Sequence, residues 1–569
     1  MNLSIDGRPV AVKPADTLLT LVKRVGLDTD KLSTRPLAAR IAGDTFTLNY
    51  VPMRKNGDSS AVPSVRRAMR AANGEVKLLR YDSPRGRRVY ERTMLFIYLM
   101  AVKKLFPNAR AVIEYAVGTG LFSTIEPAVS AADVKAIRRE MRRIVRADYR
   151  LERKRLHIDD AIEFFERDGQ RDKVRLLEWR QFTYFDVYQH GGYKDYFYGE
   201  MAPSTGYVSV FDLVYHAPGV MLIRPDDQNP DVPAKFMHTP KLSLTLRESD
   251  LWGHLMHCAT VADLNDMVAN GSVRELIRIN EALHEKKYAA IADEIVHRGA
   301  RAVMIAGPSS SGKTTSANRL MTQLRVLGKS PVLVSLDDYY IDRDKVLPNE
   351  KGEIDLEHLN TIDVELFRAD LARLLSGETV ELPKFDFISQ RRVKSNRYLS
   401  ISGDAPVVIE GLHGLNPALM PESMDKSDVF KLYVSALTTL NLDDHNRIPT
   451  TYIRLLRRMV RDYETRGASI EHTLSMWDSV RRGEDRWIFP YQESADIIMN
   501  TTLVYEPAVL KKHIFPLLNA VQAESPYFDE VRSIVKMLNY FLEADVEDEI
   551  PPTSILREFV GGNTFYRKG

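Results

Sequence analysis

Cysteine and long apolar runs are scarce in this chain of 569 residues, and each absence excludes a class of protein. Its one cysteine, Cys258, excludes an intrachain disulfide and is typical of proteins from a reducing compartment. The longest apolar run, Thr93 to Val102, is about half as long as a bilayer span requires. The first residues, MNLSIDGRPVAV, are polar where a secretory signal has its apolar segment. We therefore expect a cytoplasmic protein that does not enter a membrane.

A strong net charge is also lacking, because 79 basic and 77 acidic residues leave a net charge of +2. This balance gives no overall argument for nucleic-acid binding, but residues 135–155, KAIRREMRRIVRADYRLERKR, are locally basic and follow an amphipathic helical pattern. Such a helix either lies on RNA phosphates or exposes a solvated face above an apolar stripe. No stacking aromatic residues interleave the basic run, which favours the solvated face.

Small and hydroxyl residues concentrate in RAVMIAGPSSSGKTT at 301–315. A short apolar run typical of a buried strand precedes GPSSSGKT, which fits the phosphate-loop pattern G-x-x-x-x-G-K-[ST], and a helical pattern follows. In such a loop, backbone N–H groups and the helix N-terminus face the phosphates, Lys313 reaches the β- and γ-phosphates, and the Thr314 hydroxyl binds Mg²⁺. We thus expect ATP and Mg²⁺ as cofactors. The predicted nucleotide-binding residues are Gly307, Ser309, Ser310, Ser311, Gly312, Lys313, Thr314 and Thr315.

From residue 301 onward, strand patterns alternate with helical patterns, which predicts a mostly parallel sheet with helices on both faces. Ligands gather at the carboxyl ends of the strands in such sheets. The strand PVLVSL ends at Asp337, where a kinase needs a base for the attacking hydroxyl; the other interpretation is a helix-capping or turn aspartate.

Four motifs, GPSSSGKTT, SLDDYY, LPKFDFISQRR and VVIEGLHGL, occur in an order and spacing that resemble the uridine kinase and phosphoribulokinase family, over about residues 300–505. The resemblance implies that Asp337 is the general base for a substrate 5′-hydroxyl and that Tyr340 lies next to the nucleobase. It also implies that Glu410, which ends the strand PVVIE, holds Mg²⁺ directly or through water. A gapless alignment places Glu357 in the ribose-binding position, where Asp355 competes for the role.

The segment YIRLLRRMVRDYETRG at 452–467 resembles the family's lid, whose arginines close on the phosphates during transfer. Arg458 and Arg461 match the family's arginines best. The resemblance therefore implies that they act in catalysis with Asp337 and Lys313, and that Arg458 also contacts the substrate. A solvated helix face is the alternative for these arginines.

Four positions depart from uridine–cytidine kinases. Phe385 and Gln390 stand where that family has a Tyr and a His against the pyrimidine edge. Ala468 and Met476 replace an arginine and a glutamine after the lid. A change of hydrogen-bonding groups alters which base a site accepts. Phe385 and Gln390 remain predicted substrate contacts, because the Gln390 amide still donates and accepts.

The N-terminal residues 1–62 alternate strand patterns with one helical pattern, and ARIAGDTFTLNY supports a resemblance to the TGS domain, a β-grasp unit. Such a domain has no catalysis of its own. An interaction with RNA or a regulatory ligand and a plain packing role are both open.

Residues 65–240 resemble the second, editing-type domain of threonyl-tRNA synthetase, through RTMLFIYLMAVKKLFP and GEMAPSTGYVSVFDLVYHAPGVMLIRPD. That family has two His, a Cys and a further His that form a metal-type hydrolytic site. The four positions fall on Arg92, Phe96, Phe197 and Met201 here. An arginine cannot ligate a metal and the others offer no matching donor, so we predict that the editing chemistry is absent.

Together these patterns predict a multidomain α/β protein in which a P-loop kinase, with a parallel sheet and helices on both faces, follows a β-grasp (TGS) module and an α+β editing-like domain. The predicted function is ATP- and Mg²⁺-dependent phosphorylation of a small-molecule acceptor, a nucleoside ribose 5′-hydroxyl as in uridine. The alternatives are a kinase of a sugar phosphate or other small alcohol, and an RNA-associated regulator that binds RNA through its N-terminal half. The intact Asp337 and Glu410 favour a kinase. The expected units are 1–62 (TGS-like), 65–240 (editing-like, degenerate), 241–299 (helical connector), 300–505 (P-loop kinase) and 506–569 (C-terminal helices and tail).

Overall fold

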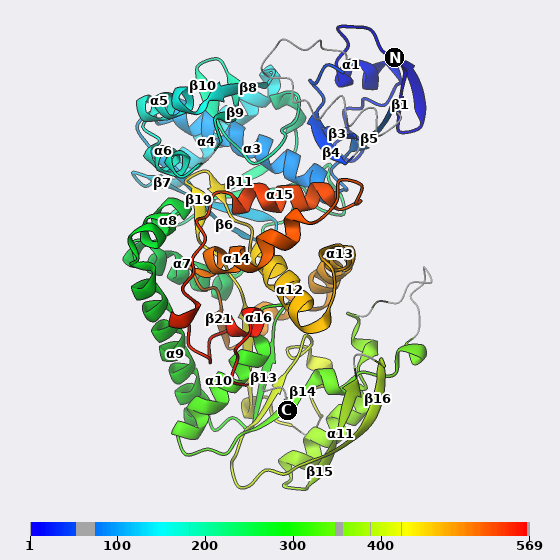
Figure 1. The fold of residues 1–569 in the computed structure, drawn as a ribbon, viewed down its shortest axis with the longest axis vertical. Coiled ribbons are helices and arrows are strands. Elements are labelled where there is room, and N and C mark those ends of the chain that lie inside the picture. Colours follow the sequence, from blue (N-terminus) through cyan, green and yellow to red (C-terminus); the bar gives the residue numbers. More distant parts are fainter. Residues whose placement is uncertain are drawn as a thin grey trace.

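The computed structural model describes residues 2–41, 43–52, 74–180, 182–346, 355, 357–386, 389–422 and 424–565. The molecule is elongated, with the N-terminal half at the top of Figure 1 and the sheet that carries the phosphate loop in the lower part. Among the described residues, no helix combines the length and the apolar character that a membrane crossing requires.

The first unit is a mixed sheet of five strands with one helix packed on it. Its elements are β1 (Asn2–Ile5), β2 (Arg8–Ala11), α1 (Leu18–Arg24), β3 (Ala38–Ile41), β4 (Asp44–Thr47) and β5 (Glu75–Leu79). The strand order is β2-β1-β5-β3-β4, and the central strands β1 and β5 are parallel. Leu3 and Ile5 share one face of β1 because side chains alternate along a strand, and they join Leu18 and Leu21 of α1 in one core.

Strand β5 corrects one expected boundary. Residues 75–79 follow the predicted end of the first unit at residue 62, yet they pair with β1 and β3 in the middle of this sheet. A boundary at residue 62 is therefore too early, because it would remove the central strand. Residues 53–73, which surround that boundary, lie outside the described part of the chain.

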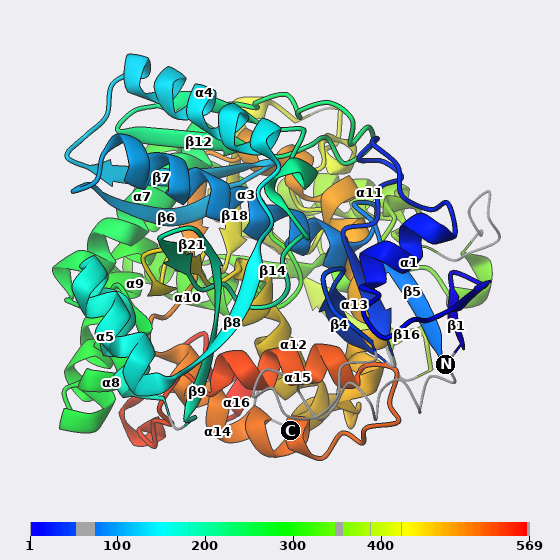
Figure 2. The same ribbon diagram turned by 90° about the horizontal axis from the view of Figure 1, so that it is seen from above.

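The second unit lies beside the first in both Figure 1 and Figure 2. It contains an antiparallel sheet in the order β11-β12-β7-β6, with the long helix α3 and helix α4 on one face. Successive side chains of β12 point to opposite faces of the sheet: Leu222 packs in the core with α3, whereas Met221 packs in the core with α7. The elements are α3 (Pro84–Leu105), β6 (Arg110–Val117), β7 (Gly120–Glu126), α4 (Ala131–Ala147), β11 (Asp212–His216), β12 (Gly219–Ile223) and α7 (Pro240–Leu255).

Helix α4 carries much of the basic segment. A capping box of Ser130 and Asp133 begins the helix, and its apolar residues face α3 as their spacing predicts. Part of its basic face is neutralised within the unit, since Arg138 pairs with Asp212 at 2.8 Å and Arg143 pairs with a glutamate on its own helix. These ion pairs are what a solvated helix face makes.

A smaller sheet completes the second unit. Its order is β10-β9-β8, and two short helices pack against it around Phe165 and Phe185. The elements are β8 (Glu152–His157), α5 (Ile158–Asp168), α6 (Arg171–Glu178), β9 (Tyr184–His190) and β10 (Tyr193–Asp195).

The four positions at which the editing resemblance expects metal-binding residues come together in the structure. The rings of Phe96 and Phe197 lie 6.4 Å apart, and Met201 is fully buried in the same core. The Arg92 guanidinium lies against the backbone two residues before Met201, where a Cβ at Gly199 would stand 2.7 Å from its nitrogen. Burial and the neighbouring Arg88 lower the pKa of Arg92. The cluster offers an apolar core and a cation in place of metal ligands.

Three helices lie between the second unit and the phosphate-loop strand: α7, α8 (Val261–Asn270) and α9 (Val273–Arg298). Helix α9 ends at Gly299, whose positive φ of 66° turns the chain into the strand β13.

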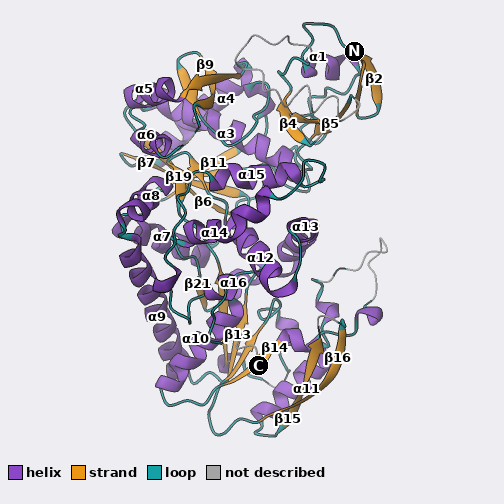
Figure 3. Cartoon of the chain, in the orientation of Figure 1, coloured by secondary structure: helices purple, strands orange, loops and turns teal. Residues whose placement is uncertain are grey.

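The lower half is built on a fully parallel sheet in the order β14-β17-β13-β18-β21. Figure 3 shows helices on both sides of this sheet. Val303 and Ile305 of β13 pack with α9 and α10, while Ala302 and Met304 pack with α11 on the other face. The predicted parallel sheet with helices on both faces is confirmed. The elements are β13 (Ala302–Ala306), α10 (Lys313–Val326), β14 (Val332–Ser335), α11 (Val364–Leu375), β17 (Val407–Glu410), β18 (Val429–Ser435) and β21 (Ile497–Asn500).

Two hairpins and a set of helices extend this core. The hairpins are β15 (Val380–Asp386) with β16 (Arg391–Leu399), and β19 (Asn441–Asp443) with β20 (Asn446–Arg447). The helices are α12 (Thr450–Arg466), α13 (Ile470–Trp487), α14 (Glu506–Asn519), α15 (Phe528–Leu538) and α16 (Arg557–Val560). Helices α12, α14 and α15 share one apolar core, so the C-terminal residues are an integral layer of the protein.

A buried ionic cluster joins the two halves. Lys173 of α6 lies 3.3 Å from Asp195 of β10 and 3.2 Å from Asp443 of β19, and all three side chains are almost fully buried. His445 pairs with Asp195 at 2.7 Å. A buried lysine is tolerated here because two carboxylates surround it.

Candidate active site

The phosphate loop runs from the end of β13 to the start of α10. Two positions in the loop require glycine. A Cβ at Gly307 would stand 2.0 Å from the Val434 carbonyl oxygen, and Gly312 caps α10 with a φ of +85°. The first N–H groups of α10 therefore point out of the loop at the carboxyl edge of the sheet, as a phosphate-binding site requires.

The polar groups of the loop fit a phosphate ligand. Ser310 and Ser311 are buried, and their hydroxyls have no hydrogen-bond partner among the described residues. The Lys313 ammonium donates to the Pro308 carbonyl at 3.3 Å and makes no ion pair within the described part of the chain. The Thr315 hydroxyl donates to Glu558 at 2.8 Å. Unsatisfied buried donors beside a helix N-terminus are typical of an anion site.

Two predicted acids lie at the ends of adjacent strands. Asp337 is in the 3-10 turn that follows β14, and Glu410 is the last residue of β17. The Ser335 hydroxyl donates to the Glu410 carboxylate at 2.8 Å. Burial raises the pKa of Asp337, which Lys313, Arg466 and Arg461 oppose. Burial and the charge of Asp337 raise the pKa of Glu410 to about 7. A divalent cation fits beside such a carboxylate pair, because it neutralises charges that burial disfavours.

Three of the predicted substrate residues, Tyr340, Phe385 and Glu357, have contacts that the structure describes. The centroids of the Tyr340 and Phe385 rings lie 5.6 Å apart, with the rings tilted relative to each other. Glu357 packs against Gly483, and one of its carboxylate oxygens is buried without a hydrogen-bond partner in the described structure. Burial and the charge of Glu484 raise the pKa of Glu357 to about 7.

Asp355 and Glu357, the two candidates for the ribose-binding role, differ in their hydrogen-bond partners. The Asp355 carboxylate accepts hydrogen bonds from the Glu357 backbone at 3.1 Å and from the Trp487 indole at 3.5 Å. Asp355 thus shapes the turn that presents Glu357. Gln390 is different, because it lies exposed at the turn between β15 and β16 with a φ of +56°. Its carbonyl accepts from the Arg343 N–H, and no contact of its side chain with the predicted substrate residues occurs within the described part of the chain.

The five arginines of α12 divide into a buried pair and a group of three. Arg454 pairs with Glu484, and Arg457 lies 2.6 Å from Glu506; both are buried, and both donate to carbonyl groups of the phosphate loop. These two hold the loop in place. Arg458 donates to the Ser309 hydroxyl at 2.9 Å.

The other three arginines share one carboxylate. Arg461, like Arg458 and Arg466, lies within 3.4 Å of the single carboxylate of Asp462. One carboxylate shared by three guanidinium groups leaves net positive charge, which is what a phosphate-closing lid needs. Arg458 and Arg461 both belong to this group, and their role as lid arginines stays a prediction.

Sequence reasoning did not single out His413, three residues after β17. Its ring is buried, and neither ring nitrogen has a hydrogen-bond partner among the described residues. Burial lowers its pKa to about 4, so the ring is neutral, and it lies beside the Glu357 backbone. The sequence feature that could have identified this residue is a histidine shortly after the strand end in VVIEGLHGL.

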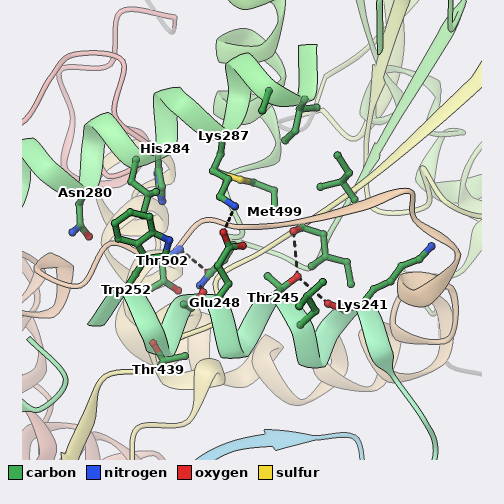
Figure 4. Close-up of a pocket in the computed structure, with 18 of the residues that line it drawn as sticks. Lys241, Thr245, Glu248, Trp252, Asn280, His284, Lys287, Thr439, Met499 and Thr502 are labelled. Carbon is green, nitrogen blue, oxygen red and sulfur yellow. Dashed lines mark hydrogen bonds and ion pairs between the residues drawn. The ribbon is translucent and has the colours of Figure 1, made fainter. Parts of the chain in front are cut away.

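A cavity of about 470 Å³ lies between α7, α9 and β21 (Figure 4). Trp252 and His284 line it, together with an ion pair between Lys287 and Glu248. None of the predicted site residues lines this cavity. It is separate from the group formed by the loop, the two acids and α12.

The comparisons with known proteins agree with this geometry. The Phosphoribulokinase / Uridine kinase family matches residues 302–505. A uridine kinase from Staphylococcus haemolyticus (strain JCSC1435) is 31% identical over 196 residues, which are 34% of this chain and 84% of the relative. A uridine kinase from Staphylococcus aureus (strain JH9) is 32% identical over the same shares.

Among solved structures, the D-glycerate 3-kinase from Cryptococcus neoformans var. grubii matches with 17% identity and a TM-score of 0.22, covering 47% of this chain and 89% of its own. The family match covers the part of the chain that holds the phosphate loop, Asp337, Glu410 and α12. The chain is an ATP-dependent kinase that belongs to the Phosphoribulokinase / Uridine kinase family.

Proposed function

We propose that this kinase transfers the γ-phosphate of ATP to the ribose 5′-hydroxyl of a nucleoside, with uridine as the first candidate. The observation that carries the proposal is the placement of Asp337 in the turn after β14, beside the strand that ends at Glu410, where the charges of Lys313 and Arg461 act on its carboxylate. A mere nucleotide switch needs no carboxylate base there. Relatives named as uridine kinases support the nucleoside.

In this mechanism the loop and the N-terminus of α10 bind the phosphates of ATP, and Lys313 reaches the transferred group. Thr314 and Glu410 would hold Mg²⁺, which would supply positive charge to the phosphates. The Asp337 carboxylate accepts the proton of the acceptor hydroxyl, whose oxygen bonds to the γ-phosphorus as the bond to the β-phosphate oxygen breaks. Arg458 and Arg461 close on the transferred group and stabilise its charge.

The acceptor side supports a nucleoside through two features. The rings of Tyr340 and Phe385 form an aromatic pair of the kind that borders a nucleobase, and the Glu357 oxygen that has no hydrogen-bond partner among the described residues accepts a hydrogen bond from a ribose hydroxyl. The Tyr and His that read the pyrimidine edge in uridine–cytidine kinases are absent. Base preference is therefore expected to be broader than in those relatives.

We propose in addition that the two N-terminal units are a TGS-like β-grasp module and a degenerate editing-like domain. The strand order with a parallel central pair supports the first. The gathering of Arg92, Phe96, Phe197 and Met201 supports the second and the loss of its hydrolytic chemistry. Ion pairs on the basic segment favour packing over RNA binding. We also propose a cytoplasmic location, which the single cysteine supports.

A panel of nucleosides, sugar phosphates and small alcohols, each with ATP and Mg²⁺, tests the acceptor by ADP release and by mass analysis of the product. We expect a nucleoside 5′-monophosphate. A phosphorylated product from a sugar phosphate alone would contradict a nucleoside as the acceptor but would agree with kinase activity. ADP release without any phosphorylated acceptor, together with tight tRNA binding, would favour a regulator.

A further inference from the structure

The C-terminal residues 554–560 fold back onto the phosphate loop, although they lie far from it in the sequence. Ser554, Ile555, Leu556 and Phe559 are almost fully buried, and the Ser554 hydroxyl hydrogen-bonds Glu281 of α9. Helix α16 packs along the lid helix α12, as the red segment beside α12 in Figure 1 shows. The segment is therefore a docked element of the kinase half.

Within this segment, Glu558 reaches the nucleotide site. The Thr315 hydroxyl, in the first turn of α10, donates to one Glu558 oxygen at 2.8 Å. The other oxygen lies 3.9 Å from the Arg461 guanidinium. A carboxylate at the N-terminus of the loop helix, faced by a lid arginine, has the surroundings that the site offers to a nucleotide phosphate.

Apolar neighbours of Glu558 cover the outer side of the loop. Ile555 packs so closely on Gly312 that a Cβ there would stand 2.7 Å from an Ile555 methyl carbon. Phe559 lies with its ring 5.2 Å from the guanidinium of Arg457, which holds the loop through its carbonyl groups. Glu558 itself is less buried than these anchors, so its carboxylate can leave Thr315 while Ile555 and Phe559 stay docked.

We propose that residues 554–560 are an autoinhibitory element in which the Glu558 carboxylate occupies an anion position of the ATP site. This inference rests on the proposed function of the loop and lid. ATP then binds fully only when a phosphate displaces Glu558 from Thr315 and Arg461, because two anions cannot share these donors. By linkage, whatever releases the segment tightens ATP binding, and ATP loosens the segment.

The test compares Glu558→Gln with Glu549→Gln in the full-length protein. Glu558→Gln keeps the side-chain shape and removes the competing charge. Glu549 lies in the same C-terminal stretch but pairs with Arg274 and Arg278, away from the loop, so it serves as the control. Equilibrium binding of a fluorescent ATP analogue with Mg²⁺ is measured for both and for the wild type. We expect the dissociation constant to fall about tenfold for Glu558→Gln only.

A second readout uses the wild-type protein, because it depends on no variant. Amide hydrogen exchange of residues 554–560 is expected to accelerate when ATP and Mg²⁺ are added. Weaker or unchanged nucleotide binding in Glu558→Gln, or slower exchange of the segment with ATP, would overturn the proposal and make the segment a permanent wall of the site. Absence of nucleotide binding in every variant would instead refute the proposed function of the loop.

Discussion

Replacing Asp337 with asparagine separates catalysis from nucleotide binding. The substitution keeps the shape of the side chain but removes the proton acceptor, and a positioned general base contributes about 10²–10⁴-fold to the rate. The expected fall in kcat is therefore about 10²–10⁴-fold, or about 3–5 kcal/mol of activation free energy. ATP affinity is expected to stay within about threefold or to improve, since removing a negative charge near Lys313 and Arg461 favours the phosphates.

The assay pairs steady-state ADP release, with the acceptor identified from the panel, with direct ATP binding. Asp338→Asn is the matched control, because Asp338 follows Asp337 in the same turn but lies 3.3 Å from Arg397 instead of facing the loop. We expect the control to lose less than about threefold in kcat, the size of a surface substitution effect. In the wild type, the rate should fall on acidification through the raised pKa of Asp337. A variant that keeps its kcat, or that loses ATP binding, would refute the assignment of the base.

Three further outcomes are expected. The pKa of Glu357 is raised to about 7, so its protonated form favours the fold and this contribution is lost as pH rises through 7. Glu357→Gln should then stabilise the ligand-free protein at pH 8, by at most about 3 kcal/mol, and much less at pH 5; an equal effect at both pH values in urea unfolding would contradict this. Lys173→Met leaves Asp195 and Asp443 buried without their cation, and should cost about 3–5 kcal/mol in unfolding free energy; a loss below about 1 kcal/mol would contradict that role. Metal analysis of purified protein should find no stoichiometric zinc, and finding it would refute the loss of the editing site.

The parts of the candidate site that consist of residues close together in the chain could be predicted from the sequence. The phosphate loop, its flanking strand and helix, and the acids at the ends of two strands all follow from local patterns. The parallel arrangement then brings Asp337 and Glu410 together without further information, because carboxyl ends of neighbouring parallel strands share one edge.

Long-range partners explain what the sequence could not reveal. Nothing in Glu75–Leu79 indicates that it pairs with β1, more than 60 residues earlier. Likewise, the sequence of α12 does not distinguish its five arginines. Arg454 and Arg457 differ from the others because they form buried ion pairs with Glu484 and Glu506, which belong to later helices. The contact of Glu558 with Thr315 spans 243 residues, and no periodicity encodes it.

Helix α15 gives the chain an unusual order of assembly. Arg85 of α3 lies 2.9 Å from Asp529, and Arg532 lies 3.0 Å from Asp44, so the last long helix contacts both N-terminal units. During synthesis those units leave the ribosome first, yet their contacts with the kinase half stay incomplete until residues 528–538 have emerged. A nascent chain stopped before α15 would thus hold the kinase and the N-terminal units together less firmly, and proteolysis between them would report how far translation had gone.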